Sequence, residues 1–270
     1  MTRIIDLLHD TRLPRLEVRM LLERALDKPR AWLLAHDTDP APAAAAELYR
    51  ALVERRQAGE PMAYLLGERE FMGHPFRVTP DVLIPRPDTE LLVETAIEAL
   101  SGKPGAALLD LGTGSGAVAV SVALARPQAV VSATDRSAAA LAVAADNAGR
   151  LGARVRFLQG DWFGALPAGE RFDVIVSNPP YIDSADPHLQ QGDLRHEPRG
   201  ALTDDADGLS ALARIAADAP DWLKPGGALW MEHGWDQAET VRALLRAAGF
   251  ASVASRRDLA GIERISGGYL

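Results

Sequence analysis

Apolar residues near the start of the chain recur three to four positions apart, the spacing of one face of an α-helix. Pro14 precedes this run, where helix starts favour proline. A second helix is predicted over residues 43–57, with Leu48, Leu52 and Val53 as its apolar stripe. We therefore predict a small helical bundle at the start of the chain. The apolar positions of the first run are Leu16, Val18, Met20, Leu21, Leu22 and Leu26.

The pattern changes after residue 68, first to a predicted β-hairpin around Gly73 and then to alternating strands and helices. Alternating units of this kind build a mostly parallel sheet that is covered by helices on both faces. Predicted strands span residues 106–109, 130–134, 155–159, 172–177 and 228–231, with a final pair at 250–254 and 262–266. Predicted helices span residues 88–100, 117–125 and 137–151.

Composition narrows the class of protein. Of the 270 residues, 47% are hydrophobic and 24% are charged, which is typical of a soluble globular chain. Cysteine is absent, which excludes a disulfide scaffold, a thiolate metal site and a cysteine nucleophile, and fits a reducing compartment such as the cytoplasm. Early acidic residues argue against a secretion signal, and no apolar run is long enough for a membrane span.

The charge distribution argues against a nucleic-acid substrate. The formal net charge is -8, whereas a protein that grips a phosphate backbone usually carries a basic surplus. Residues 1–80 contain twelve basic and twelve acidic residues, so the whole acidic excess lies in residues 81–270. We therefore expect no direct binding of nucleic acid.

A glycine-rich loop is the first feature with chemical meaning. Residues 110–116 read Asp-Leu-Gly-Thr-Gly-Ser-Gly between a predicted strand and a predicted helix. The glycines let the backbone turn sharply and let a ligand approach closely. Asp135 ends the next strand, where a carboxylate can accept hydrogen bonds from both hydroxyls of a ribose. The loop alone fits either a nicotinamide cofactor or S-adenosylmethionine, and a glycine turn needed only for packing is the alternative.

Three residues around the loop fit a nucleoside pocket. Asp110, just before the glycines, resembles the methyltransferase pattern in which an acid supports the loop. Asp161 and Trp162 follow the third strand, at the position that faces the adenine in that fold. A carboxylate there can accept from the exocyclic amine, and an indole can cover the ring. The alternative is a solvated acid beside a core tryptophan.

The tetrad Asn178-Pro-Pro-Tyr181 follows the fourth strand. Open parallel sheets bind ligands at the carboxyl ends of their strands. The two prolines stiffen the turn, which leaves the Asn178 side-chain oxygen and the Pro179 carbonyl free to accept both hydrogens of a planar amino group. Tyr181 can then stack on that plane. A proline strand terminator followed by a core tyrosine is the alternative to this interpretation.

This arrangement suits methylation of a conjugated nitrogen. An amide or aromatic amine loses conjugation and gains positive charge as it is methylated, so acceptors on its hydrogens bind more strongly in the transition state. No strong base is needed before transfer, since the proton can leave afterwards. Adenine in DNA, guanine in ribosomal RNA and the glutamine side-chain amide all offer such a group.

Several segments together resemble one family. Residues 83–90 read Leu-Ile-Pro-Arg-Pro-Asp-Thr-Glu, and with the glycine loop and Asn178-Pro-Pro-Tyr-Ile they resemble the release-factor glutamine N5-methyltransferases, the PrmC (HemK) family. Gly67-Glu-Arg-Glu-Phe, Glu197-Pro and Asp207-Gly-Leu carry the same resemblance, which spans nearly the whole chain. The tetrad is shared with adenine methyltransferases, whereas the Arg-Pro-Asp-Thr-Glu block is much more specific to this family.

The resemblance implies a fold and a set of site residues. The fold is α/β, a class I S-adenosylmethionine-dependent methyltransferase with a Rossmann-like, seven-stranded mixed sheet, a small amino-terminal helical bundle and a linking β-hairpin. Asn178, Pro179 and Tyr181 would be catalytic, and with Pro180 would bind the substrate glutamine of a Gly-Gly-Gln loop. The methyl donor S-adenosylmethionine would contact Gly112, Thr113, Gly114, Ser115, Gly116, Asp135, Asp161, Trp162 and Asn178.

The implied organisation has three parts. Residues 1–68 would form the helical bundle that docks a class 1 peptide-chain release factor, residues 69–87 the hairpin linker, and residues 88–270 the catalytic domain. We expect a cytoplasmic, monomeric enzyme. We also expect no metal site, since His74 and His233 lack metal-ligand spacing. The acid-rich segment over residues 183–210 is predicted to be a long loop that covers the glutamine site.

Three alternatives remain open from the residues alone. A nucleic-acid amino-methyltransferase acting on adenine or guanine shares the tetrad, and it would show a basic face and steep salt dependence. A non-catalytic module would bind the cofactor or a partner without methyl transfer. A nicotinamide oxidoreductase gives the tetrad no role. For Arg86, a contact with substrate or cofactor and a loop-bracing salt bridge are both compatible with its position.

Overall fold

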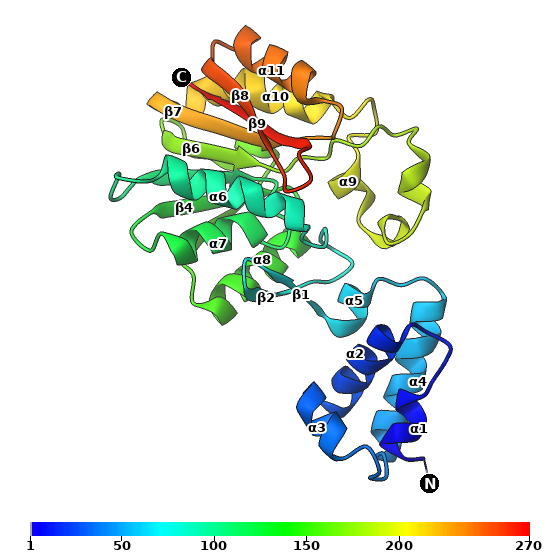
Figure 1. Ribbon diagram of the computed structural model, residues 1–270. Coiled ribbons are helices and arrows are strands. Elements are labelled where there is room, and N and C mark those ends of the chain that lie inside the picture. Colours follow the sequence, from blue (N-terminus) through cyan, green and yellow to red (C-terminus); the bar gives the residue numbers. More distant parts are fainter. Residues whose placement is uncertain (1) are drawn as a thin grey trace. The chain divides into compact units, whose positions relative to one another are not determined.

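The computed structural model describes residues 2–270, which fold as two compact units that divide between Glu68 and Arg69 (Figure 1). The first unit is built mainly from helices, and the second contains the large sheet. No helix among residues 2–270 is both long enough and apolar enough to cross a membrane. The units are described separately below.

Five helices build the first unit around a single apolar cluster. Val18, Leu21 and Leu22 lie buried on one helix, and Tyr49 and Leu52 lie buried on another. The helix predicted over residues 43–57 is confirmed as α4, and the first predicted run is α2. The five helices are α1 (Ile4–Leu8), α2 (Arg15–Leu26), α3 (Arg30–Ala35), α4 (Ala43–Gln57) and α5 (Met62–Leu66).

Two residues of the predicted apolar stripes lie outside the core of this unit. Leu16 is 56% exposed and Leu48 is 44% exposed, so their assignment to the buried faces was wrong. Each α-helical residue is rotated about 100° from the one before it. The buried face of α4 falls on Tyr49, Leu52 and Val53, which turns Leu48 toward solvent.

The second unit is built on a seven-stranded mixed sheet, as predicted. Its strand order is β5-β4-β3-β6-β7-β9-β8, with β9 antiparallel to both β7 and β8 and the other pairs parallel. The carboxyl ends of β3, β4 and β6 therefore meet at one edge. The strands are β3 (Ala107–Leu111), β4 (Val130–Asp135), β5 (Val155–Gln159), β6 (Phe172–Ser177), β7 (Leu223–Glu232), β8 (Ala251–Arg257) and β9 (Glu263–Tyr269).

Helices cover both faces of this sheet because its strands carry apolar residues on both sides. Leu108 packs in the cluster that includes α6 and α7, while Leu109 packs in the opposite cluster with α10 and α11. Successive strand residues point to opposite faces, so a continuous apolar run such as β3 serves both layers. These helices are α6 (Glu90–Ala99), α7 (Ala117–Ala125), α8 (Ala138–Leu151), α10 (Ser210–Asp218) and α11 (Ala238–Ala247).

The predicted hairpin around Gly73 consists of β1 (Glu68–Phe71) and β2 (His74–Arg77). Gly73 has a φ of 76°, a left-handed conformation that favours glycine in such a turn. Phe71 and Phe76 are buried in the same cluster as α6 and α7. The hairpin is therefore part of the core of the second unit.

Residues 183–210, expected as a long loop, contain short helical turns. They are η3 (Pro187–Gln190), η4 (Leu194–His196) and α9 (Arg199–Leu202). The side chain of Asp186 accepts a hydrogen bond from the His188 amide and so caps η3, and prolines stand at or just before the starts of η3 and α9. These local contacts fold the segment into short helical turns. Such turns show no hydrophobic periodicity, so the sequence pattern does not reveal them.

Candidate active site

A cavity of about 300 Å³ lies at the carboxyl ends of β3, β4 and β6, within the second unit. Ligand pockets have volumes of about 300–1,000 Å³ and in open α/β sheets lie at this edge. Sequence-predicted site residues that line it are Gly112, Thr113, Gly114, Ser115, Asp135, Asp161, Trp162, Asn178 and Pro180. Gly116, Pro179 and Tyr181 are predicted site residues that are not part of this lining.

The Asp110 carboxylate holds the glycine loop through hydrogen bonds. Its side chain is 2% exposed, and Oδ2 accepts a hydrogen bond from Thr113 Oγ1 at 2.7 Å and from the Ala119 amide at 3.2 Å. The carboxylate thereby joins the loop to the first turn of α7. Burial raises the pKa of Asp110 to about 6, although both hydrogen bonds favour the ionised form.

Two glycines of the loop serve different purposes. Gly112 has a φ of +72°, and a Cβ there would lie 3.2 Å from the Trp162 ring, so glycine lets the indole lie against the loop. Gly116 is the N-cap of α7 and has a φ of +82°. A Cβ at Gly116 would lie 3.1 Å from the Cβ of Ala144 in α8. Gly116 thus allows close helix packing beside the cavity.

Asp135, at the end of β4, is held in place by backbone donors. The Gly114 amide donates to Oδ2 at 2.9 Å and the Ser137 amide donates to Oδ1 at 2.9 Å. Each carboxylate oxygen has a further lone pair for a ligand hydroxyl. A carboxylate fixed in this way, beside a glycine-lined cavity, fits the ribose of a nucleoside ligand such as S-adenosylmethionine.

Asp161 and Trp162 follow β5 and line the cavity. The Asp161 side chain is 56% exposed, and its Oδ2 accepts from Arg214 Nη1 at 2.5 Å. Trp162 has a φ of 51°, an uncommon left-handed conformation for a bulky residue. That conformation occurs where the ring lines the ligand cavity, as strained backbone often does at binding sites.

The Asn-Pro-Pro-Tyr tetrad follows β6, and two of its side chains have defined partners. Asn178 Nδ2 donates to Thr89 Oγ1 at 3.2 Å. The Tyr181 hydroxyl donates to Glu232 Oε1 at 3.1 Å, and burial raises the pKa of Tyr181 well above its ordinary value. With Nδ2 bound to Thr89, the Asn178 oxygen is left as an acceptor.

The sequence interpretation identified neither Thr89, which lines the cavity, nor Glu232, which accepts from Tyr181. Thr89 belongs to the Arg-Pro-Asp-Thr-Glu block and lines the cavity, just before α6. Glu232 ends β7 and is 2% exposed, and burial raises its pKa to about 7. The specificity of the block could have pointed to Thr89. A single acid at the end of an apolar strand carries no comparable signal for Glu232.

Arg86 forms an ion pair with the buried carboxylate of Glu197. Glu197 Oε2 also accepts from the Ile84 amide at 3.0 Å, so this carboxylate braces the 83–90 segment. Burial raises the pKa of Glu197, and the Arg86 charge opposes that shift. Arg86 also lines the cavity. It therefore both forms the salt bridge that braces the 83–90 segment and lies beside the space for a ligand.

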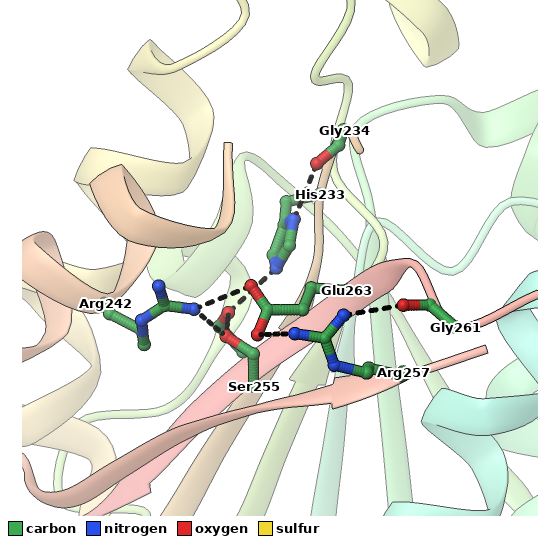
Figure 2. A network of polar contacts seen from close by, with 8 residues as sticks. His233, Gly234, Arg242, Ser255, Arg257, Gly261 and Glu263 are labelled. Carbon is green, nitrogen blue, oxygen red and sulfur yellow. Dashed lines mark hydrogen bonds and ion pairs between the residues drawn. The ribbon is translucent and has the colours of Figure 1, made fainter. Parts of the chain in front are cut away.

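His233, next to Glu232, belongs to a structural network rather than to the cavity lining (Figure 2). Its Nε2 pairs with Ser266 Oγ at 2.8 Å, and Ser266 pairs with Ser255 at 2.7 Å. Burial lowers the pKa of His233, which favours the neutral ring. The network joins β7, β8 and β9 and so holds the end of β7 in place.

The mixed sheet, the glycine loop and the acid at the end of β4, together with a match of residues 87–193 to a methyltransferase family, define a class I S-adenosylmethionine-dependent methyltransferase. Residues 1–67 match the PrmC N-terminal domain, and residues 87–193 match the methyltransferase small domain. The chain belongs to the release factor glutamine methyltransferase family. The resemblance inferred from the sequence motifs is thereby confirmed.

Two curated relatives match this chain in sequence over nearly its full length. A release factor glutamine methyltransferase of Bordetella pertussis is 71% identical over 100% of both chains. One of Burkholderia pseudomallei is 57% identical over 98% of this chain and 95% of that one. The crystal structure of a methyltransferase from Pyrococcus furiosus is 20% identical, with a TM-score of 0.56 over 82% of this chain and 96% of that one, and shares the fold.

Proposed function

We propose that this enzyme transfers a methyl group from S-adenosylmethionine to the side-chain amide nitrogen of the glutamine in the Gly-Gly-Gln motif of class 1 peptide-chain release factors. One observation carries the proposal. Asn178 Nδ2 donates one hydrogen bond to Thr89 Oγ1, which leaves the Asn178 side-chain oxygen to accept a hydrogen bond from a substrate amide. Because release factors act in translation, we also propose that the enzyme works in the cytoplasm.

In this proposal the methyl donor is held by the cavity residues. Asp135 would bind the ribose hydroxyls and Trp162 would cover the adenine. The Gly112–Gly116 loop would lie close to the bound ligand. Asp161 would accept from the adenine amine while its other oxygen pairs with Arg214. When bound, S-adenosylmethionine supplies an activated methyl group.

The tetrad would bind and activate the glutamine amide. Asn178 Oδ1 and the Pro179 carbonyl accept its two hydrogens, Pro180 keeps the turn stiff and Tyr181 packs on the amide plane. As the nitrogen is methylated it loses conjugation and gains positive charge, so both acceptors bind its hydrogens more strongly than before. The proton leaves afterwards, and no strong base is required.

The first unit, residues 1–68, would dock the release factor. The match to the PrmC N-terminal domain supports this role. The acidic excess of residues 81–270 supports a protein-borne amide over a nucleic-acid base, because no basic surplus is available to neutralise phosphates.

A methyl-mapping experiment tests the function. The protein is incubated with labelled S-adenosylmethionine and purified release factors, and the label is located by mass spectrometry. We expect one methyl group on the glutamine of the Gly-Gly-Gln motif. Label on nucleic acid, with none on glutamine, would contradict the proposal.

The Asn178→Ala variant tests the tetrad. Loss of one preorganised hydrogen-bonding group costs about 10²–10³-fold in turnover, so we expect that loss with S-adenosylmethionine binding, measured by calorimetry, largely intact. Gln128→Ala removes an exposed carboxamide between α7 and β4 and is the matched control. Equal turnover for wild type and Asn178→Ala would remove the tetrad from the mechanism.

A further inference from the structure

A polar side chain on the turn after β7 has no part in the mechanism above. Gln237 is the N-cap residue of α11, yet its side chain makes no capping hydrogen bond within the described residues 2–270. Side chains that cap a helix are usually those of Ser, Thr, Asp or Asn, which are short enough to reach its first free amides. The Gln237 carboxamide instead contacts three backbone groups outside the helix. Its role therefore lies outside the start of α11.

The three partners of the Gln237 carboxamide fix its orientation. Its Oε1 accepts from the Gly234 amide at 2.8 Å, and its Nε2 donates to the Tyr181 carbonyl at 2.9 Å and to the Gly208 carbonyl at 3.4 Å. A backbone N–H only donates and a backbone carbonyl only accepts. A flipped amide would place NH₂ against an N–H and oxygen against two carbonyl oxygens, so these contacts exclude the flip.

Gly208 lies directly on the Tyr181 carbonyl. It has a φ of +75°, and a Cβ there would overlap the Tyr181 carbonyl oxygen. The Asp204 carboxylate holds this turn, because it accepts from the Gly208 amide at 3.0 Å and from the Ser210 amide at 2.8 Å. Gly208 belongs to the Asp207-Gly-Leu segment that carries part of the family resemblance. The contact therefore places that segment beside the tetrad.

Tyr181 is held at both ends of its side chain and backbone. Its hydroxyl donates to Glu232 Oε1 at 3.1 Å, and its carbonyl accepts from Gln237. Glu232 ends β7, and Gln237 stands at the far end of the turn that follows. Because β7 lies beside β6, both supports reach the tetrad from the neighbouring strand. The ring therefore has a defined position relative to Asn178 and Pro179.

The network drawn in Figure 2 holds the other side of the same turn. His233 Nδ1 pairs with the Gly234 carbonyl at 2.8 Å, and the Gln237 amide donates to that carbonyl at 3.1 Å. A Cβ at Gly234 would lie 3.0 Å from Gln237 Oε1, so glycine lets the carboxamide lie against the turn. His233 also pairs with Ser266 of β9. The turn that carries Gln237 is thus fixed to the sheet.

We propose that Gln237 is a positioning residue for methyl transfer, which holds the Tyr181 backbone and so places the Tyr181 ring against the substrate amide. The inference rests on the proposed function and deepens it. Within the described chain, Gln237 is not among the residues that line the cavity, so it acts on the tetrad rather than on the methyl donor. A misplacement of about 1 Å at a reacting group can cost about 100-fold in rate.

Two substitutions test the contact between Gln237 and Tyr181. Gln237→Met keeps the approximate length of the side chain and removes all three hydrogen bonds. Gln237→Glu, assayed above neutral pH, keeps an acceptor for Gly234 but places an oxygen without a hydrogen against the Tyr181 and Gly208 carbonyls. We expect kcat to fall by up to about 100-fold in both variants. The affinity for S-adenosylmethionine, measured by calorimetry, should change little.

Arg126→Met is the matched control, because it also removes three hydrogen bonds from a side chain that joins two segments. Arg126 donates to the Ile97 carbonyl through Nε at 3.4 Å and Nη2 at 3.2 Å, and to Ser101 Oγ at 2.8 Å. These contacts join the carboxyl ends of α6 and α7, away from the tetrad. We expect Arg126→Met to lose thermal stability and to keep the wild-type kcat, whereas Gln237→Met loses kcat.

Fluorine nuclear magnetic resonance reports the Tyr181 ring without turnover. The chain has four tyrosines, so protein labelled with fluorotyrosine gives four resonances, and the one missing from Tyr181→Phe belongs to Tyr181. We expect that resonance to shift or broaden in Gln237→Met and Gln237→Glu, because the backbone under the ring is released. It should stay unchanged in Arg126→Met.

Two outcomes would each overturn the inference: wild-type kcat in both Gln237 variants, or an unchanged Tyr181 resonance in both. Thermal unfolding shows whether each variant is folded, and Gln237→Glu decides the question if Gln237→Met does not fold. If wild type methylates no release factor, the proposed function fails, while the Tyr181 resonance still decides whether Gln237 positions the ring.

Discussion

Single residues at the cavity combine a structural and a chemical task, and Asp110 is the clearest case. It is buried so that it can hold both Thr113 and the start of α7, and burial raises its pKa to about 6. A carboxyl whose pKa is higher in the folded state than in the unfolded chain binds more protons when folded. Its contribution to stability is therefore present at acidic pH and is lost as pH rises.

The Asp110→Asn variant isolates this effect. The folded pKa of about 6 exceeds the ordinary value of 3.8, so wild type should lose up to about 3 kcal/mol of unfolding free energy relative to the variant between pH 4 and pH 7. The Asn oxygen still accepts from Thr113. Urea unfolding of both proteins at the two pH values measures the difference, with the exposed Asp221→Asn as control. A constant gap between wild type and Asp110→Asn would contradict this assignment.

At the scale of elements, the antiparallel end of the sheet depends on one close contact between β7 and β9. Trp230 of β7 lies directly opposite Gly267 of β9, and the Arg256 guanidinium lies over the indole at 4.9 Å from the ring centroid. A Cβ at Gly267 would lie 2.3 Å from the Trp230 ring and 2.4 Å from the Leu229 carbonyl oxygen. Glycine is required there because the ring occupies the space of a side chain.

The Gly267→Ala variant should therefore be strongly destabilised. Overpacking usually costs about 1–3 kcal/mol, and we expect the upper end or more because the carbonyl oxygen cannot move away as a side chain can. Gly149→Ala is the matched control, since Gly149 is in α8 and its Cβ would meet nothing within 4 Å. It should gain up to about 1 kcal/mol in helix propensity. Chemical unfolding of wild type and the two variants measures their free energies of unfolding. Equal stability of Gly267→Ala and wild type would contradict the close contact between Gly267 and Trp230.

At the scale of the whole molecule, our proposal assigns chemistry and docking to different units. All residues that line the cavity belong to the second unit, whereas residues 1–67 match the PrmC N-terminal domain. Leu34 of α3 is 67% exposed and is a candidate contact for the release factor that we propose as substrate.

Leu34→Asp should separate the two tasks. We expect a higher KM for an intact release factor and an unchanged rate with a short Gly-Gly-Gln peptide, because a peptide reaches the tetrad without the docking surface. Leu259→Asp changes an exposed leucine between β8 and β9 and is the control. Stability should be unaffected in both, since neither leucine is buried. Equal effects of Leu34→Asp on protein and peptide substrates would argue against docking by this face.

Local signals in the sequence determined the elements and the main binding loop. The helix predicted over residues 117–125 coincides with α7, and the predicted strands at 155–159 and 172–177 coincide with β5 and β6. These predictions succeed because periodicity, glycine and proline act within a few residues. α10 and α11 were not predicted, and Leu16 and Leu48 were placed on the wrong side of their helices.

The tertiary structure alone decided which distant side chains meet. Asn178 contacts Thr89 from a distant segment, and Tyr181 contacts Glu232 because β7 lies beside β6 in the sheet. The sequence by itself determined the chemical identity of the loop, the tetrad and the family. The Tyr181 hydroxyl donates to a buried carboxylate, and burial is a property of the packed fold rather than of any local pattern.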